Sequence, residues 1–227
     1  MTRLLPLRPL TSKHLDPGTR MGEILFGLIM TLTFTLGAGL MLEEEGAEGA
    51  RQLLIATIGC NVAWGLIDGV LYVLGQLFER ARLRRVAVAV QQATSEEEAL
   101  GLVADEFDET LGAVTSQTER ERLYRSVVQN VRSVPSVPRA AVRREDLLGG
   151  LASGWLVFAC SFPAALPFLF IDDPLVALRV SNALLLGLLF IVGYRAAKLT
   201  LAKPWLVGTM FLLAGLLLVL ISIALGG

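Results

Sequence analysis

Asp68 and Asn61 are polar residues inside a long apolar stretch of the chain. A carboxylate near the middle of a membrane span costs about 2.5–3.5 kcal/mol, so such residues usually face the interior of a helix bundle and mark an ion or proton path. Asn61 comes seven residues before Asp68, which places both side chains on nearly the same face of a helix. We therefore interpret Asp68, assisted by Asn61, as the centre of a transport path.

A second apolar stretch begins beside Glu23, and Met30 follows Glu23 by seven residues. Met30 falls at nearly the same depth as Asp68 if both stretches are membrane helices, and Thr33 is close by. Carboxylates and a thioether together suit a transition metal better than Mg²⁺ or Ca²⁺. The sequence thus predicts a polar seam between two helices, made of Glu23, Met30, Thr33, Asn61 and Asp68. The structural alternative is a protonated Asp68 that is hydrogen-bonded to an Asn or Thr of the neighbouring helix.

Three further acids, Glu98, Asp105 and Glu109, occur in a polar part of the chain. Their spacing of seven and four residues places the carboxylates on one side of a helix. Clustered oxygen ligands of this kind can hold Fe²⁺ or Mn²⁺, although a solvated acidic face has the same pattern. We predict Glu23, Asp68 and these three acids as metal ligands, with the metal as transported substrate and no resident cofactor.

The composition predicts that these residues sit on a membrane scaffold. The chain has 227 residues, of which 54% are hydrophobic and 18% charged, and its mean hydropathy is +0.62. A soluble domain of this size needs more polar surface, and a net charge of −1 gives no reason to expect a nucleic-acid partner. A spanning helix needs about twenty mostly apolar residues. Five segments qualify, at residues 22–42, 52–78, 147–171, 174–198 and 204–227, so we predict an all-α polytopic protein of the lipid bilayer.

The charges that flank these segments predict an orientation. Basic residues gather after the second and fourth segments (Arg80, Arg82, Arg84, Arg85; Arg195, Lys198, Lys203), and acidic residues form loops after the first and third (Glu43, Glu44, Glu45, Glu48; Asp172, Asp173). The tail before the first segment is also basic. This alternation follows the positive-inside rule and predicts a cytoplasmic N-terminus and an external C-terminus. The lack of targeting and glycosylation signals favours a bacterial inner membrane.

The chain is thereby divided into a basic cytoplasmic tail (1–21), two membrane helices (22–78), a small cytoplasmic helical insert (79–146) and three membrane helices (147–227). In the insert, residues 79–92 are expected to continue the second span as a helix. Two more helices begin at capping boxes, residues 95–98 and 116–119, and prolines at 135 and 138 end the last one. Apolar residues at helical spacing give each a buried stripe: Leu100, Val103, Phe107 and Leu111 on one, and Leu123, Val127 and Val131 on the other.

Small residues and prolines predict local features of the membrane helices. Gly65 and Gly69 form a small-xxx-small pair that lets another helix approach closely. Pro163 and Pro167 each remove a backbone donor and are expected to kink the third span. Helix packing explains all four residues, and the alternative for the prolines is a gating hinge.

Several short motifs make the chain resemble the vacuolar iron transporter family. Residues 23–27 (Glu-Ile-Leu-Phe-Gly) and 36–40 (Leu-Gly-Ala-Gly-Leu) are similar to the two ends of the family's first span, with Glu23 at its acidic position. Residues 147–150, Pro163, Pro167 and residues 203–205 are similar to its last third. The resemblance implies five spans, a cytoplasmic N-terminus and a metal-binding insert between spans two and three.

The chain departs from that family where the family's first span has an Asp-Gly step. Met30-Thr31 stands there instead, and an Asp-Gly step appears as Asp68-Gly69 in the second span. The insert also has a basic first helix and fewer glutamates than the resemblance implies.

The leading hypothesis is a homodimeric transporter that exports iron or manganese from the cytoplasm in exchange for protons. The alternative is a non-transporting scaffold of the same fold whose insert binds a partner, which the missing first-span acid favours. An enzyme is not expected, because Asp68 is predicted to be the sole well-buried carboxylate and no acid–base pair or nucleophile motif lies within a span.

Overall fold

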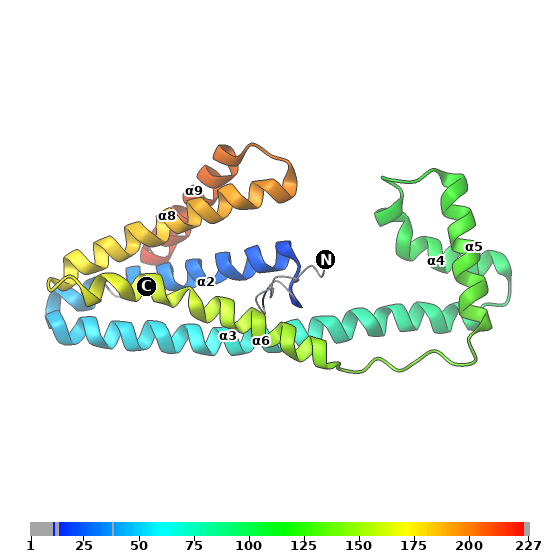
Figure 1. Cartoon of the computed structure of the whole chain (residues 1–227), viewed down its shortest axis with the longest axis horizontal. Coiled ribbons are helices and arrows are strands. Elements are labelled where there is room, and N and C mark those ends of the chain that lie inside the picture. The colour runs from blue at the N-terminus through cyan, green and yellow to red at the C-terminus, as the bar shows by residue number, and fades with distance from the viewer. Residues whose placement is uncertain (1–10, 12–13, 38, 225–227) are drawn as a thin grey trace, which may run out of the picture. The chain divides into compact units, whose positions relative to one another are not determined.

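The computed structural model describes residues 11, 14–37 and 39–224, with the backbone alone at residues 37, 39–47, 219, 222 and 223 (Figure 1). Helices form all of its regular structure, and the described part of the chain contains no strand. The chain packs into two compact units, Met1–Val73 with Arg144–Gly227 and, separately, Leu74–Arg143. Most of the tail predicted at residues 1–21 lies outside the described residues.

Long apolar helices build the first unit. Its elements are α2 (Pro17–Gly37), the first part of α3 (Gly39–Gln92), α6 (Arg144–Ala159), α7 (Ser161–Ala165), the 3₁₀ helix η1 (Leu166–Leu169), α8 (Pro174–Thr200) and α9 (Pro204–Ala224). Within the described residues, four segments are long and apolar enough to cross a membrane: Pro17–Leu36, Glu48–Gln92, Arg144–Leu169 and Pro174–Thr200. The apolar run described in α9, Pro204–Leu218, is shorter. The predicted all-α fold is confirmed, and its apolar helices are compatible with a membrane protein.

The helix α2 lies inside the first unit, where it packs against α6, α8 and α9 (Figure 1). Its inward face contributes Leu28 and Leu32 to an apolar core that includes Cys160, Ala164, Leu185 and Leu189. Because α2 is covered on several sides, Thr31 and Thr35 on its inward side are buried.

The helix α3 is longer than the sequence pattern indicated. It begins at Gly39 and runs without interruption to Gln92. The acidic residues 43–48, expected in a loop, therefore lie in the first turns of a helix, and the expectation of a loop there was wrong. The predicted helical continuation over residues 79–92 is confirmed.

Glycines bring α3 and α6 into backbone contact. A Cβ atom added to Gly65 would lie 2.6 Å from the carbonyl oxygen of Gly154, and one added to Gly69 would lie 2.6 Å from that of Gly150. The predicted small-xxx-small pair is thus confirmed as a packing motif, and a second pair with the same spacing, Gly150 and Gly154, faces it.

The segment that contains Pro163 and Pro167 is broken into separate helices, which is a larger change than the predicted kink required. The helix α6 ends at Ala159, Pro163 lies in the short helix α7, and Pro167 lies in η1. The break follows from the missing backbone donors of the two prolines. Asp173 then caps α8 by accepting hydrogen bonds from the amides of Leu175 (2.9 Å) and Val176 (3.1 Å).

The second unit consists of the last part of α3 with α4 (Glu96–Leu111) and α5 (Gln117–Ser133). Its core contains Val90, Ala99, Val103, Tyr124 and Val128, with Leu100, Phe107, Leu111, Val127 and Val131 packed around it. The stripe predicted on α4 is confirmed. The stripe on α5 was wrong at one position, because Tyr124 points into the core and Leu123 is exposed.

Both helices of this unit begin at a capping serine. Ser116 and Glu119 form the predicted capping box, in which Glu119 accepts hydrogen bonds from the amide (3.0 Å) and hydroxyl (2.7 Å) of Ser116. At α4, Ser95 accepts from the amide of Glu98 as predicted, but the Glu98 carboxylate reaches one residue further back, to the amide and hydroxyl of Thr94 (both 2.8 Å).

We expect Ser116→Ala to speed hydrogen exchange at the first-turn amides of α5 about fivefold at neutral pH, because a lost Ser cap costs about 1 kcal/mol. Hydrogen bonds from Ser116 hold the pKa of Glu119 below its usual value. The stabilisation is therefore complete above the ordinary pKa of a glutamate and is lost as the pH falls through the lowered pKa of Glu119. The difference between wild type and variant should shrink in acid. Exchange mass spectrometry measures both effects, and the exposed Ser126→Ala is the control.

Candidate ion-binding site

Three polar side chains from three helices meet inside the first unit. Glu23 comes from α2, Asp68 from α3 and Ser153 from α6. The Ser153 hydroxyl donates a hydrogen bond to Asp68 Oδ2 (3.1 Å), and the Glu23 carboxyl lies within hydrogen-bonding reach of both Asp68 and Ser153. Ser153 is fully buried, whereas the two acids are half-buried. We call these three residues the acid pair site.

The close contact of α3 and α6 places the acid pair site. Asp68 neighbours Gly69, and Ser153 neighbours Gly154, so the glycine contacts bring these two polar side chains together. Two carboxyl groups at hydrogen-bonding distance repel each other when both are ionised. A shared proton or a bound cation removes this repulsion, so the arrangement can exchange one for the other.

A second polar contact follows along the same helices. Asn61 is 1% exposed, and its amide nitrogen donates to Thr31 Oγ1 (2.7 Å) and to the carbonyl oxygen of Val157 (3.4 Å). These bonds join α3 to α2 and α6. The predicted shared face of Asn61 and Asp68 is therefore an inward face.

The face of α2 that meets Asn61 differs from the face that was predicted. Thr31, not Thr33, bonds Asn61, and the Thr33 hydroxyl donates to the carbonyl of Ile29 in its own helix (2.9 Å). Met30 is half-buried and precedes Thr31. Of the five residues predicted to line the path, the structure brings Glu23 and Asp68 together and places Asn61 against Thr31. The role of Met30 and Thr33 in a path stays a prediction.

The expectation that Asp68 is the sole well-buried carboxylate was wrong. Asp68 is half-buried and has Glu23 beside it, whereas Asp146, in the first turn of α6, is only 5% exposed. Asp146 lies near Tyr72, whose hydroxyl donates to the carbonyl of His14 (3.1 Å). An acid in a first turn has the pattern of a helix-end residue, so the sequence alone gave no signal that Asp146 is buried.

The three acids predicted to bind metal in the second unit lie on its surface. Glu98, Asp105 and Glu109 are exposed, and Glu98 is held by Thr94, whose hydrogen bonds lower the pKa of Glu98. Across the described part of the chain, no group of three or more His, Cys, Asp or Glu side chains lies close enough to hold a metal ion by itself. Metal binding by these three acids stays a prediction.

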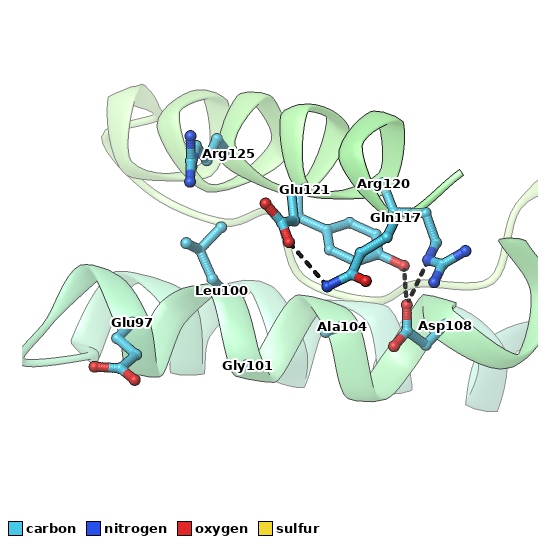
Figure 2. Close-up of a pocket in the computed structure, with 10 residues that line it drawn as sticks. Glu97, Leu100, Gly101, Ala104, Asp108, Gln117, Arg120, Glu121 and Arg125 are labelled. Atoms are coloured by element: carbon cyan, nitrogen blue, oxygen red, sulfur yellow. Dashed lines mark hydrogen bonds and ion pairs between the residues drawn. The ribbon is translucent and has the colours of Figure 1, made fainter. Parts of the chain in front are cut away.

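A groove of about 520 Å³ lies between α4 and α5 (Figure 2). On one side of it, Tyr124 Oη donates to Asp108 Oδ1 (2.8 Å), and Arg120 Nε pairs with the same oxygen (3.1 Å). Burial raises the pKa of Tyr124, and the Asp108 carboxylate adds to the effect. Gln117 also donates to Glu121 (3.2 Å). The hydrogen-bonding groups of these side chains are paired with one another. The groove therefore gives no sign of a ligand site, and we interpret it as a gap between the two packed helices.

The chain matches no protein family model, and a search of curated proteins finds no match. The resemblance to vacuolar iron transporters therefore stays an expectation. The fold and the acid pair site define the class: an all-helical protein with several long apolar helices, compatible with the membrane, and a polar site inside its helix bundle.

Proposed function

We propose that the chain is a membrane transporter that moves a divalent transition metal, Fe²⁺ or Mn²⁺, out of the cytoplasm through the acid pair site. The observation that carries the proposal is the meeting of Glu23, Asp68 and Ser153 from three apolar helices. Ionisable residues inside a membrane bundle are expensive and usually belong to ion or proton paths.

The chemistry of the acid pair site suits such a cargo. Two carboxylates match the charge of a divalent ion, and their oxygens with the Ser153 hydroxyl are ligands that Fe²⁺ and Mn²⁺ accept. Water would supply the remaining ligands. When the ion leaves, a proton can take its place between Glu23 and Asp68, which gives a physical basis for proton coupling.

The proposed topology has five spans, with α9 as the fifth, and a cytoplasmic insert between the second and third. Basic residues flank the spans at the end where Glu23 lies, which supports entry of the ion from the cytoplasm. On this topology the N-terminus is cytoplasmic and the C-terminus external, as in a bacterial inner-membrane protein. The working unit is proposed to be a homodimer, and the chain is not proposed to be an enzyme.

The alternative function is a non-transporting scaffold whose insert binds a partner. It is favoured by one observation: Met30 stands at the position of the missing first-span acid, and the next residue, Thr31, is engaged by Asn61 and donates to the carbonyl of Gly27 (2.7 Å). The uncharged Met30 leaves no carboxylate at the position where the resemblance leads one to expect an acid.

Metal uptake by the purified full chain in liposomes separates the two functions. For the transporter, a fluorescent indicator inside the vesicles should report Mn²⁺ or Fe²⁺ entering faster than in protein-free vesicles of the same lipid, and a pH indicator should report protons moving the opposite way. Uptake equal to that of protein-free vesicles, for both metals and in either direction of a pH gradient, would support the scaffold.

A further inference from the structure

Polar residues continue beyond the acid pair site toward the N-terminal end of α3. Asp68 is followed in that direction by Gly65, Asn61 and Thr57, which are close to one helical turn apart and share a face. Thr57 and Asn61 are each 1% exposed. On α2, Thr31 and Thr35 run in parallel, and Thr35 donates to Asn182 Oδ1 of α8 (2.7 Å). The buried seam is therefore longer than the acid pair site.

The hydroxyl of Thr57 differs from those of the other threonines in this seam. Thr31 and Thr33 each donate to a carbonyl oxygen of α2, at 2.7 and 2.9 Å, and the Thr35 hydroxyl is bonded to Asn182. Thr57 Oγ1 is buried and has no hydrogen-bond partner among the described residues. A buried hydroxyl left unpaired is destabilising, and a threonine in a helix can usually avoid that cost by bonding a carbonyl of the preceding turn. The Thr57 hydroxyl is thus available to bond a partner other than these residues, such as a water molecule.

An apolar cluster closes the seam just past Thr57. Ala50 and Leu53, on the same face of α3, pack with Leu178 of α8, and Phe34, Phe168 and Leu175 surround them. Thr57 is therefore the last polar group on this face of α3 before the cluster.

We propose that Thr57 and Asn61 form a second, uncharged station that binds water and receives the cation with water molecules still attached. Neutral oxygens do not replace the charge of two carboxylates, so a divalent ion past Asp68 would keep aqua ligands, and the Thr57 hydroxyl and the Asn61 amide can bind those. The cation rests on the proposed transport function, whereas the hydration of Thr57 does not.

The test is thiol accessibility in the full chain in liposomes. In a Cys60→Ala, Cys160→Ala background, Thr57→Cys is treated with a small cationic methanethiosulfonate reagent. The control is Val62→Cys, on the same helix but 51% exposed on its apolar outer surface. A thiol reacts as the thiolate, which requires water, so residue 57 should react about tenfold or more faster than residue 62 despite its burial. Equal or slower reaction at residue 57 would overturn the proposal, whatever the transport assay shows.

A second comparison tests the role of the hydroxyl. Thr57→Val should lower Mn²⁺ uptake about fivefold or more and Thr57→Ser should retain it, while Thr200→Val, whose hydroxyl bonds Ala197 in its own helix, should match wild type. Normal uptake by Thr57→Val would overturn the station. A raised melting temperature of the same variant would show that the Thr57 hydroxyl is unpaired and binds no water. If Asp68→Asn abolishes uptake while Thr57→Val is normal, only the station fails. If wild type moves no metal, the proposed transport fails, and the thiol reaction still decides the hydration.

Discussion

The variant Gly65→Leu is expected to lose native packing between α3 and α6 and to unfold at a much lower temperature than wild type. Even a Cβ atom at this position would lie 2.6 Å from the carbonyl oxygen of Gly154, which belongs to rigid backbone and cannot move aside as a side chain would. A leucine forces the two helices apart, and we expect a loss of about 3 kcal/mol or more. Thermal unfolding in detergent, followed by size-exclusion chromatography, measures the effect.

Gly59→Leu is the matched control. Gly59 lies on the same helix, and a Cβ atom added to it would have no neighbour within 4 Å. The control should melt close to wild type, because it adds one apolar side chain to an open surface. If both variants melted alike, the close contact between α3 and α6 would not be a feature of the folded protein, and the juxtaposition of Asp68 and Ser153 would lose its support.

The variants Asp68→Asn and Glu23→Gln are expected to reduce Mn²⁺ uptake to the level of protein-free vesicles. Each substitution removes one of two negative charges but keeps the size of the side chain, so it lowers the affinity for a divalent ion without opening a cavity. Because the two acids act on one ion, the double variant should be no worse than either single variant. Initial rates in liposomes at matched protein density provide the comparison.

Glu79→Gln is the control for charge alone. Glu79 is an exposed acid of α3 that pairs with Arg82 (3.5 Å), and it lies in the other compact unit. Its neutralisation should leave uptake unchanged. Full uptake by Asp68→Asn would exclude the acid pair site as the route of the metal.

Periodicity and charge predicted much of the fold. The long apolar helices, the break at Pro163 and Pro167 and the capping box at Ser116 and Glu119 follow from short-range rules that hold in any context. The start of α3 and the exposure of Leu123 were missed for a different reason. An acidic stretch is compatible with both a loop and a first turn, and a stripe of apolar residues fixes a helix face only to within about one residue.

The acid pair site was only partly predictable. The seven-residue spacing of Asn61 and Asp68 identified an inward face of α3, and Glu23 was expected on the helix beside it. Ser153 was missed, because nothing in a run of small and apolar residues indicates which serine meets a carboxylate on another helix. The choice of Thr31 over Thr33 depends on the rotation of α2 about its axis, which its packing partners set.

The central claim is that Glu23 and Asp68 together hold the metal, and the most direct measurement is the anomalous scattering of crystals of the full chain soaked in Mn²⁺. We predict one anomalous peak between the Glu23 and Asp68 carboxylates, beside Ser153, that disappears in crystals of Asp68→Asn. An anomalous peak beside Glu98, Asp105 and Glu109 instead, or no peak in the helix bundle at a Mn²⁺ concentration that saturates uptake, would contradict the account.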